Sequence, residues 1–382
     1  MNFSSSLKIA AISLTAAAVS VSAQARELNY SLGLGPGSAV ALAAEDYATA
    51  VEKASAGALT IRVFPLELVS LPEMGPGIRD GLTDMGYMAA PYYPAEFAHS
   101  NFLAELSMLQ TTLPQTGKED LAYAGAMSEF ITTKCPECLE EFKEQNHVYM
   151  GHIASSPYVL LCNSEIKSAA DLKGKRLRAG GASYKRFAEH FGAVGVQMAA
   201  SEAYEALSQG VLDCAILSIP ELTNFRLMEV VKSVTLGIPG NVFGGTVAGN
   251  INRDVWQSLS DEERAIMLRE GTDLAAGITW NYHSANARDL EAARAEGKTI
   301  IEPDASFKQK MADFVIADNK VVAEIFNTNY GVENASKMQS EFEPLLTKWA
   351  GLVEGVDSAA ALGELYWTEI FSKLDPKSYG LN

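Results

Sequence analysis

The sequence predicts an α/β protein of two domains that face each other across a cleft, with one long helix spanning both. Three observations support this fold class. The chain has 382 residues, of which 48% are hydrophobic, and a single hydrophobic core stops growing near roughly 250–300 residues. A strand–helix–strand–helix–strand pattern occurs twice along the chain. A stretch at 260–296 is free of proline and begins with a helix-capping motif.

The N-terminus has the features of a secretory signal. Residues 7–23 are apolar or small and carry one charge, Lys8, and Ala23-Gln24-Ala25 has the small-x-small form of a signal-peptidase site. The alternative is a short buried helix, but two charged residues follow directly. We therefore interpret residues 1–25 as a signal peptide that is removed, and we expect the mature protein in the periplasm. No later run of about 20 apolar residues predicts a membrane span.

The first domain begins with an alternating strand at 28–34, where every second side chain is apolar. Ser38 follows and can cap a helix, because apolar residues then recur with a helical period through 40–54. A second alternating strand spans 59–63 and a third spans 83–89, with a short helical stretch between them. This order is typical of a parallel sheet with helical crossovers.

The same order returns in the middle of the chain. The expected elements are strand 176–179, helix 184–191, strand 196–198, helix 203–208 and strand 212–217. In both passages a Gly-x-x-Asp turn leads into the last strand, at Gly81 and at Gly210. The repeat predicts two similarly built α/β domains with mainly parallel central strands. Ligands of such sheets bind beyond the carboxyl ends of the strands, so two facing domains form a cleft.

A long helix is expected at 260–296. Ser260 and Glu263 have the spacing of a capping box, and one helix over this stretch would measure about 50 Å, enough to cross both domains. Two helices broken at Gly271 or Gly277 are the alternative. The expected boundaries are 26–150 with 242–280 for the first domain, 151–241 for the second, and 281–382 for the rest of the long helix and the C-terminal helices that pack across both.

The four cysteines fit an exported chain. Cys135 and Cys138 form a CxxC motif between two helical stretches. We expect a disulfide there that staples a surface turn, because a zinc site would need two more ligands. Cys162 and Cys214 each lie in an apolar strand-like run, and we expect two buried thiols at these positions.

Composition and motifs exclude several functions. The formal net charge of −17 disfavours a nucleic-acid partner, which needs a basic face. The sequence contains no G-x-S-x-G, no H-E-x-x-H and no Walker loop, and the glycines at 33–37 lack the spacing of a dinucleotide-binding loop. The five histidines do not recur at metal-ligand spacing. We therefore expect no catalytic residues, no metal site and no cofactor.

Four motifs, in order and with preserved spacing, resemble those of one family. Ser168–Arg178 resembles the D-L-K-G-x-K-I-R segment of the solute-binding proteins of TRAP (tripartite ATP-independent periplasmic) transporters. Tyr204–Asp213 is similar to the family's Y-x-A-L-Q-x-G-x-V-D stretch, Phe225–Lys232 to its F-Y-E-V-x-K helix, and Asp254–Ser260 to its W-x-x-L segment. The resemblance is to the dicarboxylate-receptor type and covers most of the mature chain. It implies the periplasmic binding protein fold, in which two domains close on a small organic acid.

The resemblance also implies a binding site. The family arginine that pairs with the ligand carboxylate corresponds to Arg178, whereas a family asparagine is replaced by Leu217. A second family arginine has no match at 151–158, where Ser155 and Ser156 offer hydroxyls instead. A monoanion with an apolar or aromatic body therefore fits better than a dicarboxylate. The further candidate ligand-binding residues are Ser38, Tyr92, Tyr93, Ser218 and Phe243, with core packing as the alternative for the aromatic ones.

The position of Arg178 agrees with this assignment. It stands at the carboxyl end of the expected strand, directly before Gly180-Gly181, where the crevice of an α/β sheet opens. Its guanidinium offers two parallel N–H donors to a carboxylate. The neighbouring cations Lys173, Lys175 and Arg176 are interpreted as solvated charges.

The predicted function is that of a monomeric periplasmic receptor that captures a small organic carboxylate and delivers it to the membrane subunits of a TRAP transporter. Two alternatives stay open: a secreted enzyme on a related scaffold, and a receptor that hands its ligand to a membrane-bound sensor. The lack of a recognisable nucleophile with a nearby base favours a receptor over an enzyme.

Overall fold

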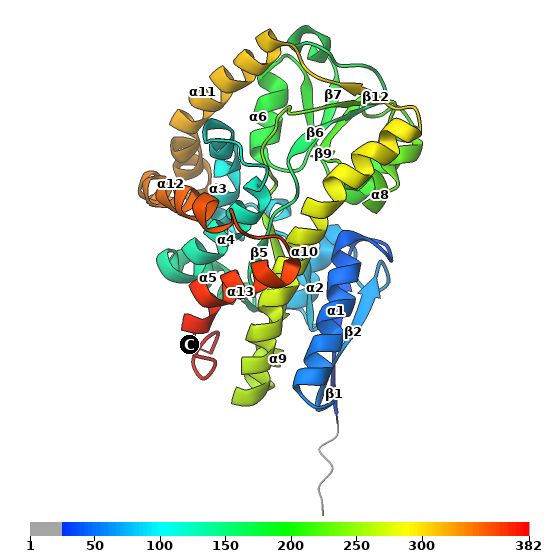
Figure 1. The fold of residues 1–382 in the computed structure, drawn as a ribbon. Coiled ribbons are helices and arrows are strands. Elements are labelled where there is room, and N and C mark those ends of the chain that lie inside the picture. Colours follow the sequence, from blue (N-terminus) through cyan, green and yellow to red (C-terminus); the bar gives the residue numbers. More distant parts are fainter. Residues whose placement is uncertain (1–24, 382) are drawn as a thin grey trace, which may run out of the picture.

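The computed structural model describes residues 25–381, so the predicted signal peptide, 1–25, lies outside the described residues except for Ala25. Two six-stranded sheets form the centres of two lobes. The long helix α10 (Asp261–Ala295) runs across both lobes (Figure 1). Within 25–381 no helix combines the length and the apolar character needed to cross a membrane.

Lobe 1 is built on the sheet that contains the N-terminal strand. Its order is β2-β1-β3-β11-β4, with β5 also paired to β11. As predicted, β1 is parallel to both β2 and β3, while β11 is antiparallel to its neighbours. The strands are β1 (Arg26–Leu32), β2 (Leu59–Pro65), β3 (Met85–Ala89), β4 (His147–Val148), β5 (His152–Ile153) and β11 (Thr246–Asn252).

Lobe 2 repeats this plan with the order β12-β10-β6-β9-β7-β8. Here β7 is parallel to β8 and β9, and β6 joins the sheet antiparallel to β9. The predicted parallel strands therefore form half of each sheet. The strands that complete each sheet, which include the parallel pair β10 and β12, lay outside the sequence repeat. The strands are β6 (Tyr158–Cys162), β7 (Arg176–Ala179), β8 (Val194–Gln197), β9 (Cys214–Ser218), β10 (Ser233–Thr235) and β12 (Thr299–Ile301).

Two extended segments, 153–158 and 241–246, connect the lobes and hydrogen-bond to each other. The Ser155 amide donates to the Phe243 carbonyl at 3.0 Å, and the Tyr158 amide donates to the Asn241 carbonyl at 2.8 Å. Helix α10 is the third connection, and it is continuous through both of its glycines, so the alternative of two shorter helices is wrong.

Two helices begin directly after the capping residues that the sequence predicted for them. The Ser38 hydroxyl accepts the Ala41 amide at the start of α1 (Ala39–Ala54), and Ser260 and Glu263 form the capping box of α10. The other helices are α2 (Met74–Arg79), α3 (Ala98–Glu105), α4 (Glu119–Lys134), α5 (Pro136–Glu144), α6 (Ala182–His190), α7 (Ala203–Ser208), α8 (Glu221–Asn224), α9 (Arg253–Ser258), α11 (Ala305–Tyr330), α12 (Ala335–Leu352) and α13 (Ala359–Glu369).

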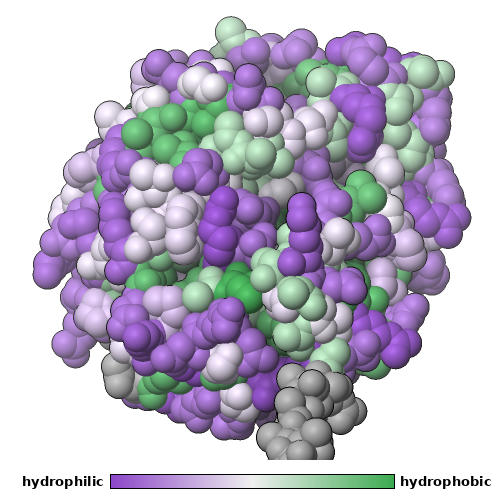
Figure 2. Space-filling view, turned by 60° about the horizontal axis from the view of Figure 1, so that its bottom comes forward, coloured by the Kyte–Doolittle hydropathy of each residue, from purple (hydrophilic) through white to green (hydrophobic). Residues whose placement is uncertain are grey.

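Each lobe has its own hydrophobic cluster, and a third cluster forms where α3, α4 and α5 pack with the C-terminal helices α12 and α13. In Figure 2 hydrophilic residues cover much of the face shown, with hydrophobic residues in small groups between them. This distribution is typical of a surface exposed to water.

All four cysteines form disulfides, which corrects two expectations. Cys135 and Cys138 are bonded as predicted, but they are 1% and 0% exposed and pack in the cluster of α4 and α5, not on a surface turn. Cys162 and Cys214, expected as free thiols, are bonded to each other. They stand directly opposite in the pairing of β6 with β9, a register that the separate strand patterns did not reveal.

Removal of the local disulfide should leave ligand binding intact. The Cys135→Ala/Cys138→Ala variant should lose less stability from loop closure than the roughly 3 kcal/mol of a 15-residue loop, because so short a loop costs little entropy to close. Its ligand affinity should stay within about threefold of wild type, since distant sites act independently. Calorimetric titration of the folded variant checks this, and loss of binding in a variant that stays folded would refute a purely structural role.

Candidate ligand-binding site

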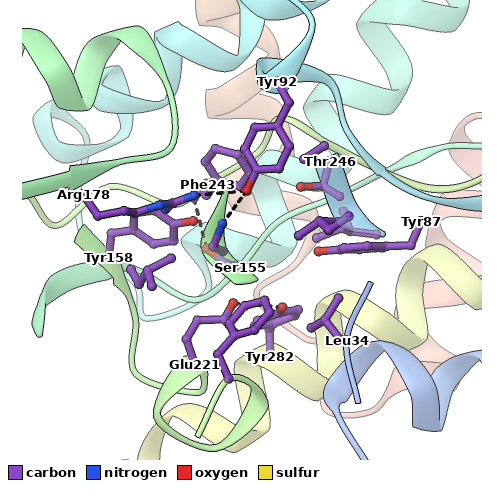
Figure 3. A pocket seen from close by; sticks show the side chains of 16 residues that line it. Leu34, Tyr87, Tyr92, Ser155, Tyr158, Arg178, Glu221, Phe243, Thr246 and Tyr282 are labelled. Carbon is purple, nitrogen blue, oxygen red and sulfur yellow. Dashed lines mark hydrogen bonds between the residues drawn. The ribbon is translucent and has the colours of Figure 1, made fainter. Parts of the chain in front are cut away.

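A cavity of about 30 Å³ lies between the lobes and is lined by both of them (Figure 3). In its present volume it has room for about two water molecules. Lobe 1 contributes Leu34, Tyr87, Tyr92 and Thr246; lobe 2 contributes Tyr158, Arg178, Leu217 and Glu221; the connecting segments contribute Ser155 and Phe243, and α10 contributes Tyr282.

Among residues 25–381, Arg178 is the only lysine or arginine that lines this cavity. It lies on β7, and its side chain is 1% exposed. Its Nε donates to the Met198 carbonyl at 3.0 Å, and Nη1 lies 3.4 Å from the Ile216 carbonyl. These two carbonyls, together with the surrounding strands, hold the guanidinium at the carboxyl end of the sheet.

No carboxylate forms an ion pair with Arg178 anywhere in the part of the chain that the structure describes. A buried charge is costly unless it is paired. The nearby Arg176 differs in this respect, because it is partly exposed and pairs with Asp213, with 3.0 Å between Nε and Oδ2. Of these two arginines, Arg178 is the one that is available to an anion in the cavity.

Gly180 makes room for the guanidinium. A Cβ at this position would lie 2.7 Å from Nη1 and 2.8 Å from Nη2 of Arg178. Real Cβ atoms do not approach other atoms so closely, so any larger residue would displace the guanidinium. This contact explains why glycine follows the strand here.

Tyr92 joins the two lobes at the cavity. Its hydroxyl oxygen accepts hydrogen bonds from Arg178 Nη2 at 3.1 Å and from the Ala200 amide at 2.8 Å (Figure 3). Tyr92 also lines a more open hollow of about 330 Å³ with Gly180 and Met198. The phenol ring therefore borders both the cavity and the more open hollow.

Aromatic rings form one wall of the cavity. Phe243 stacks on Tyr158 with 5.5 Å between ring centroids and 6° between ring planes. Tyr184 lies behind them, 5.1 Å from the Tyr158 ring, and its hydroxyl accepts a hydrogen bond from Asn241 at 3.0 Å. Such a wall offers a flat apolar surface to a ring or chain.

Glu221 is the one acidic residue that the described part of the chain contributes to the cavity lining. Its carboxyl group accepts the Tyr282 hydroxyl and the Asn224 amide, each at 3.0 Å. Burial raises the pKa of Glu221 to about 7, while these two hydrogen bonds and the charge of Arg178 act in the opposite direction. The cavity thus contains one fixed positive charge and one carboxyl group that titrates near neutral pH.

The predicted site residues divide into two groups. Arg178, Tyr92, Ser155, Leu217 and Phe243 line the cavity together. The other predicted residues lie outside the lining: Ser38 caps α1, Tyr93 donates to the Pro72 carbonyl, and the hydroxyls of Ser156 and Ser218 are buried without a hydrogen-bond partner among the described residues. The Ser155 hydroxyl is already used, because it donates to the Ser156 carbonyl and accepts the Phe243 amide.

Sequence reasoning missed Tyr87, Tyr158, Glu221, Thr246 and Tyr282, all of which line the cavity. A signal existed for Glu221, because it follows the carboxyl end of β9 by three residues, and polar residues at such ends are candidates for ligand contacts. Tyr282 carried no signal, since it belongs to the buried face of α10. Among the described residues no group of three or more His, Cys, Asp or Glu side chains is arranged to hold a metal ion.

Two α/β lobes that enclose a cavity, joined by two extended segments and a long helix, define a solute-binding protein of the two-domain type. The family model for bacterial extracellular solute-binding protein family 7 matches residues 30–329. The chain therefore belongs to this family, whose members bind solutes and are not enzymes.

Known proteins agree with this assignment. A solute-binding protein of Albidiferax ferrireducens is 22% identical over 269 residues, which cover 69% of this chain and 75% of that protein. A marine metagenome TRAP solute-binding protein specific for aromatic acid ligands, solved with metahydroxyphenylacetate, is 19% identical, with a TM-score of 0.72 over 85% of this chain and 99% of that one. A Bordetella bronchiseptica TRAP periplasmic solute-binding protein solved with mandelate is 22% identical, with a TM-score of 0.71 over the same shares.

Proposed function

We propose that the protein captures a small organic carboxylate, a monoanion with an apolar or aromatic body, and delivers it to the membrane subunits of a TRAP transporter. The observation that carries this proposal is the buried Arg178, which has no carboxylate partner among the described residues. A ligand carboxylate would supply the missing negative charge and could accept two parallel N–H bonds from the guanidinium.

The rest of the cavity supports the proposed ligand class. The described residues contribute one cation to its lining, so a second carboxylate on the ligand would lack a partner. The stacked Tyr158 and Phe243, with Leu217, provide apolar surface for the body of the ligand. The similar solved proteins that were bound to metahydroxyphenylacetate and mandelate also carried aromatic monocarboxylic acids.

The proposal includes a closing motion and a location. The cavity of about 30 Å³ is smaller than any aromatic acid, so the lobes or the lining side chains have to move apart for binding. The connecting segments 153–158 and 241–246 are the natural hinge, because they join the lobes as extended chain. We place the mature protein in the periplasm as a monomer, with domains at 26–150 plus 242–280 and at 151–241, and with 281–382 packing across both.

A thermal-shift screen tests the ligand class. Refolded, ligand-free protein would be heated with benzoate, phenylacetate, mandelate, 3-hydroxybenzoate and pyroglutamate, and with succinate and benzamide as dicarboxylate and neutral controls. A ligand at 100 times its dissociation constant adds about 2.7 kcal/mol of stability, which raises the melting temperature measurably. We expect a shift with at least one monocarboxylate and a smaller one with each control. A shift with benzamide alone would contradict the proposal.

A further inference from the structure

Glu221 lies in the same cavity as Arg178 but has no role in holding a carboxylate. It is the first residue of α8 and is 4% exposed. Its Oε1 accepts the Tyr282 hydroxyl and its Oε2 accepts the Asn224 amide, each at 3.0 Å. In Figure 3 Glu221 and Tyr282 lie together on one side of the cavity, with Tyr92 on the other.

The carboxyl group of Glu221 has acceptor capacity left over. A carboxylate offers about four lone-pair positions for hydrogen bonds, and the two neighbouring donors occupy only part of them. Among residues 25–381 no lysine, arginine or histidine forms an ion pair with Glu221. A buried carboxyl is costly in its ionised form when it has no cation, and its place in a cavity lining suggests a partner that comes from the ligand.

The charged and titratable groups around Glu221 come from several elements. Arg178 on β7 favours the ionised form, whereas Asp289 on α10 disfavours it. The phenols of Tyr87, Tyr158 and Tyr282 are neutral and surround the group from β3, β6 and α10. Beyond Tyr282 and Asn224 an ionised Glu221 has room for a further hydrogen-bond donor, and no lysine, arginine or histidine among the described residues forms an ion pair with it.

We propose that Glu221, with Tyr282 beside it, is a second polar contact of the cavity. It accepts a hydrogen bond from the ligand and so selects carboxylates that carry a donor, either a hydroxyl or an N–H group. This inference rests on the proposed function, because Arg178 is taken to hold the carboxylate. Hydroxy acids and cyclic or free amino acids belong to the selected class. Acids without a donor bind through Arg178 alone and leave a buried acceptor unpaired.

Matched ligand pairs test the proposal by calorimetric titration at pH 8. The pairs are mandelate with phenylacetate, 3-hydroxybenzoate with benzoate, and pyroglutamate with cyclopentanecarboxylate. In wild type we expect the donor-bearing member of at least one pair to bind about 10- to 100-fold more tightly, the range for a hydrogen bond to a charged group. In Glu221→Leu this ratio should fall to about threefold or less, because the donor-free member no longer leaves a buried acceptor unpaired and binds at least as tightly as it does to wild type.

Two further variants keep the test decisive. Glu221→Gln conserves shape, so it covers the case in which Glu221→Leu does not fold, and it should lower the ratio severalfold by removing the charge. Glu205→Gln changes an exposed glutamate on α7 of the same lobe and should leave every ratio unchanged. In wild type the ratio should also fall at pH 5.5, where the Glu221 carboxyl is protonated, and should not change with pH in Glu221→Gln.

The outcomes separate the two claims. Equal affinities within every pair in wild type, or a donor advantage that survives in Glu221→Leu, would overturn the role of Glu221 and leave the carboxylate receptor intact. Failure of every acid in the panel to bind wild type would instead overturn the proposed function.

Discussion

Arg178→Ala should weaken the binding of a carboxylate by about 2–5 kcal/mol, the cost of truncating one member of a buried, hydrogen-bonded charge pair. The side chain is buried and, among the residues that the structure describes, is the only cation of the cavity lining. Arg178→Lys should also weaken binding, because an ammonium keeps the charge but loses the planar fork that matches two carboxylate oxygens. Calorimetric titration with the acid that gives the largest thermal shift measures both losses.

Arg176→Ala is the matched control for this prediction. It removes an arginine two residues away on the same strand, but one that pairs with Asp213 at the surface. The ligand affinity of the Arg176→Ala variant should equal that of wild type. Wild-type affinity in a folded Arg178→Ala protein, together with a loss in Arg176→Ala, would show that the wrong arginine has been assigned to the ligand.

Arg186→Ala should destabilise the fold by about 3–5 kcal/mol, because it leaves two buried carboxylates without their cation. The Arg186 guanidinium on α6 binds Asp318 of α11 through Nε at 2.6 Å and Nη2 at 2.8 Å, and Nη1 lies 3.0 Å from Oε2 of Glu105 on α3. The side chains of Glu105 and Asp318 are 7% and 4% exposed. Denaturant unfolding at pH 7.5 measures the loss.

The loss should shrink in acid. Burial raises the pKa of the Glu105 carboxyl in the folded protein, and the charge of Arg186 opposes this rise. Without the cation the ionised carboxyl is penalised more, so the deficit of the variant appears as pH rises through this raised pKa and shrinks as the pH is lowered and the carboxyl takes up a proton. Lys337→Ala, which breaks an exposed pair with Glu341, should cost less than about 0.5 kcal/mol. An equal and pH-independent loss in both variants would refute the account of this network.

The parts of the fold that were predictable depend on signals local in the chain. Ser38 and Ser260 predicted the starts of two helices, because a capping side chain bonds to backbone within one helical turn. The repeated strand and helix pattern predicted the parallel strands β1–β3 of lobe 1 and β7–β9 of lobe 2. Arg178 was identified by its place at a strand end and by a family motif, and it lies in the cavity between the lobes.

The parts that were missed depend on contacts between distant residues. Cys162 and Cys214 are 52 positions apart and meet only because β6 and β9 pair in one particular register. Glu221 and Tyr282 are 61 positions apart, and their hydrogen bond forms where α8 contacts α10. Neither pairing has a periodicity or a local motif that a single sequence would display, since each is a product of tertiary packing.

A crystal structure with the strongest acid from the thermal-shift panel tests the central claim most directly. We expect the ligand between the lobes, its carboxylate oxygens about 2.7–2.9 Å from the terminal nitrogens of Arg178 and its apolar body against Tyr158 and Phe243. A carboxylate bound away from Arg178, with the guanidinium still bonded only to Tyr92 and the backbone carbonyls, would contradict the account.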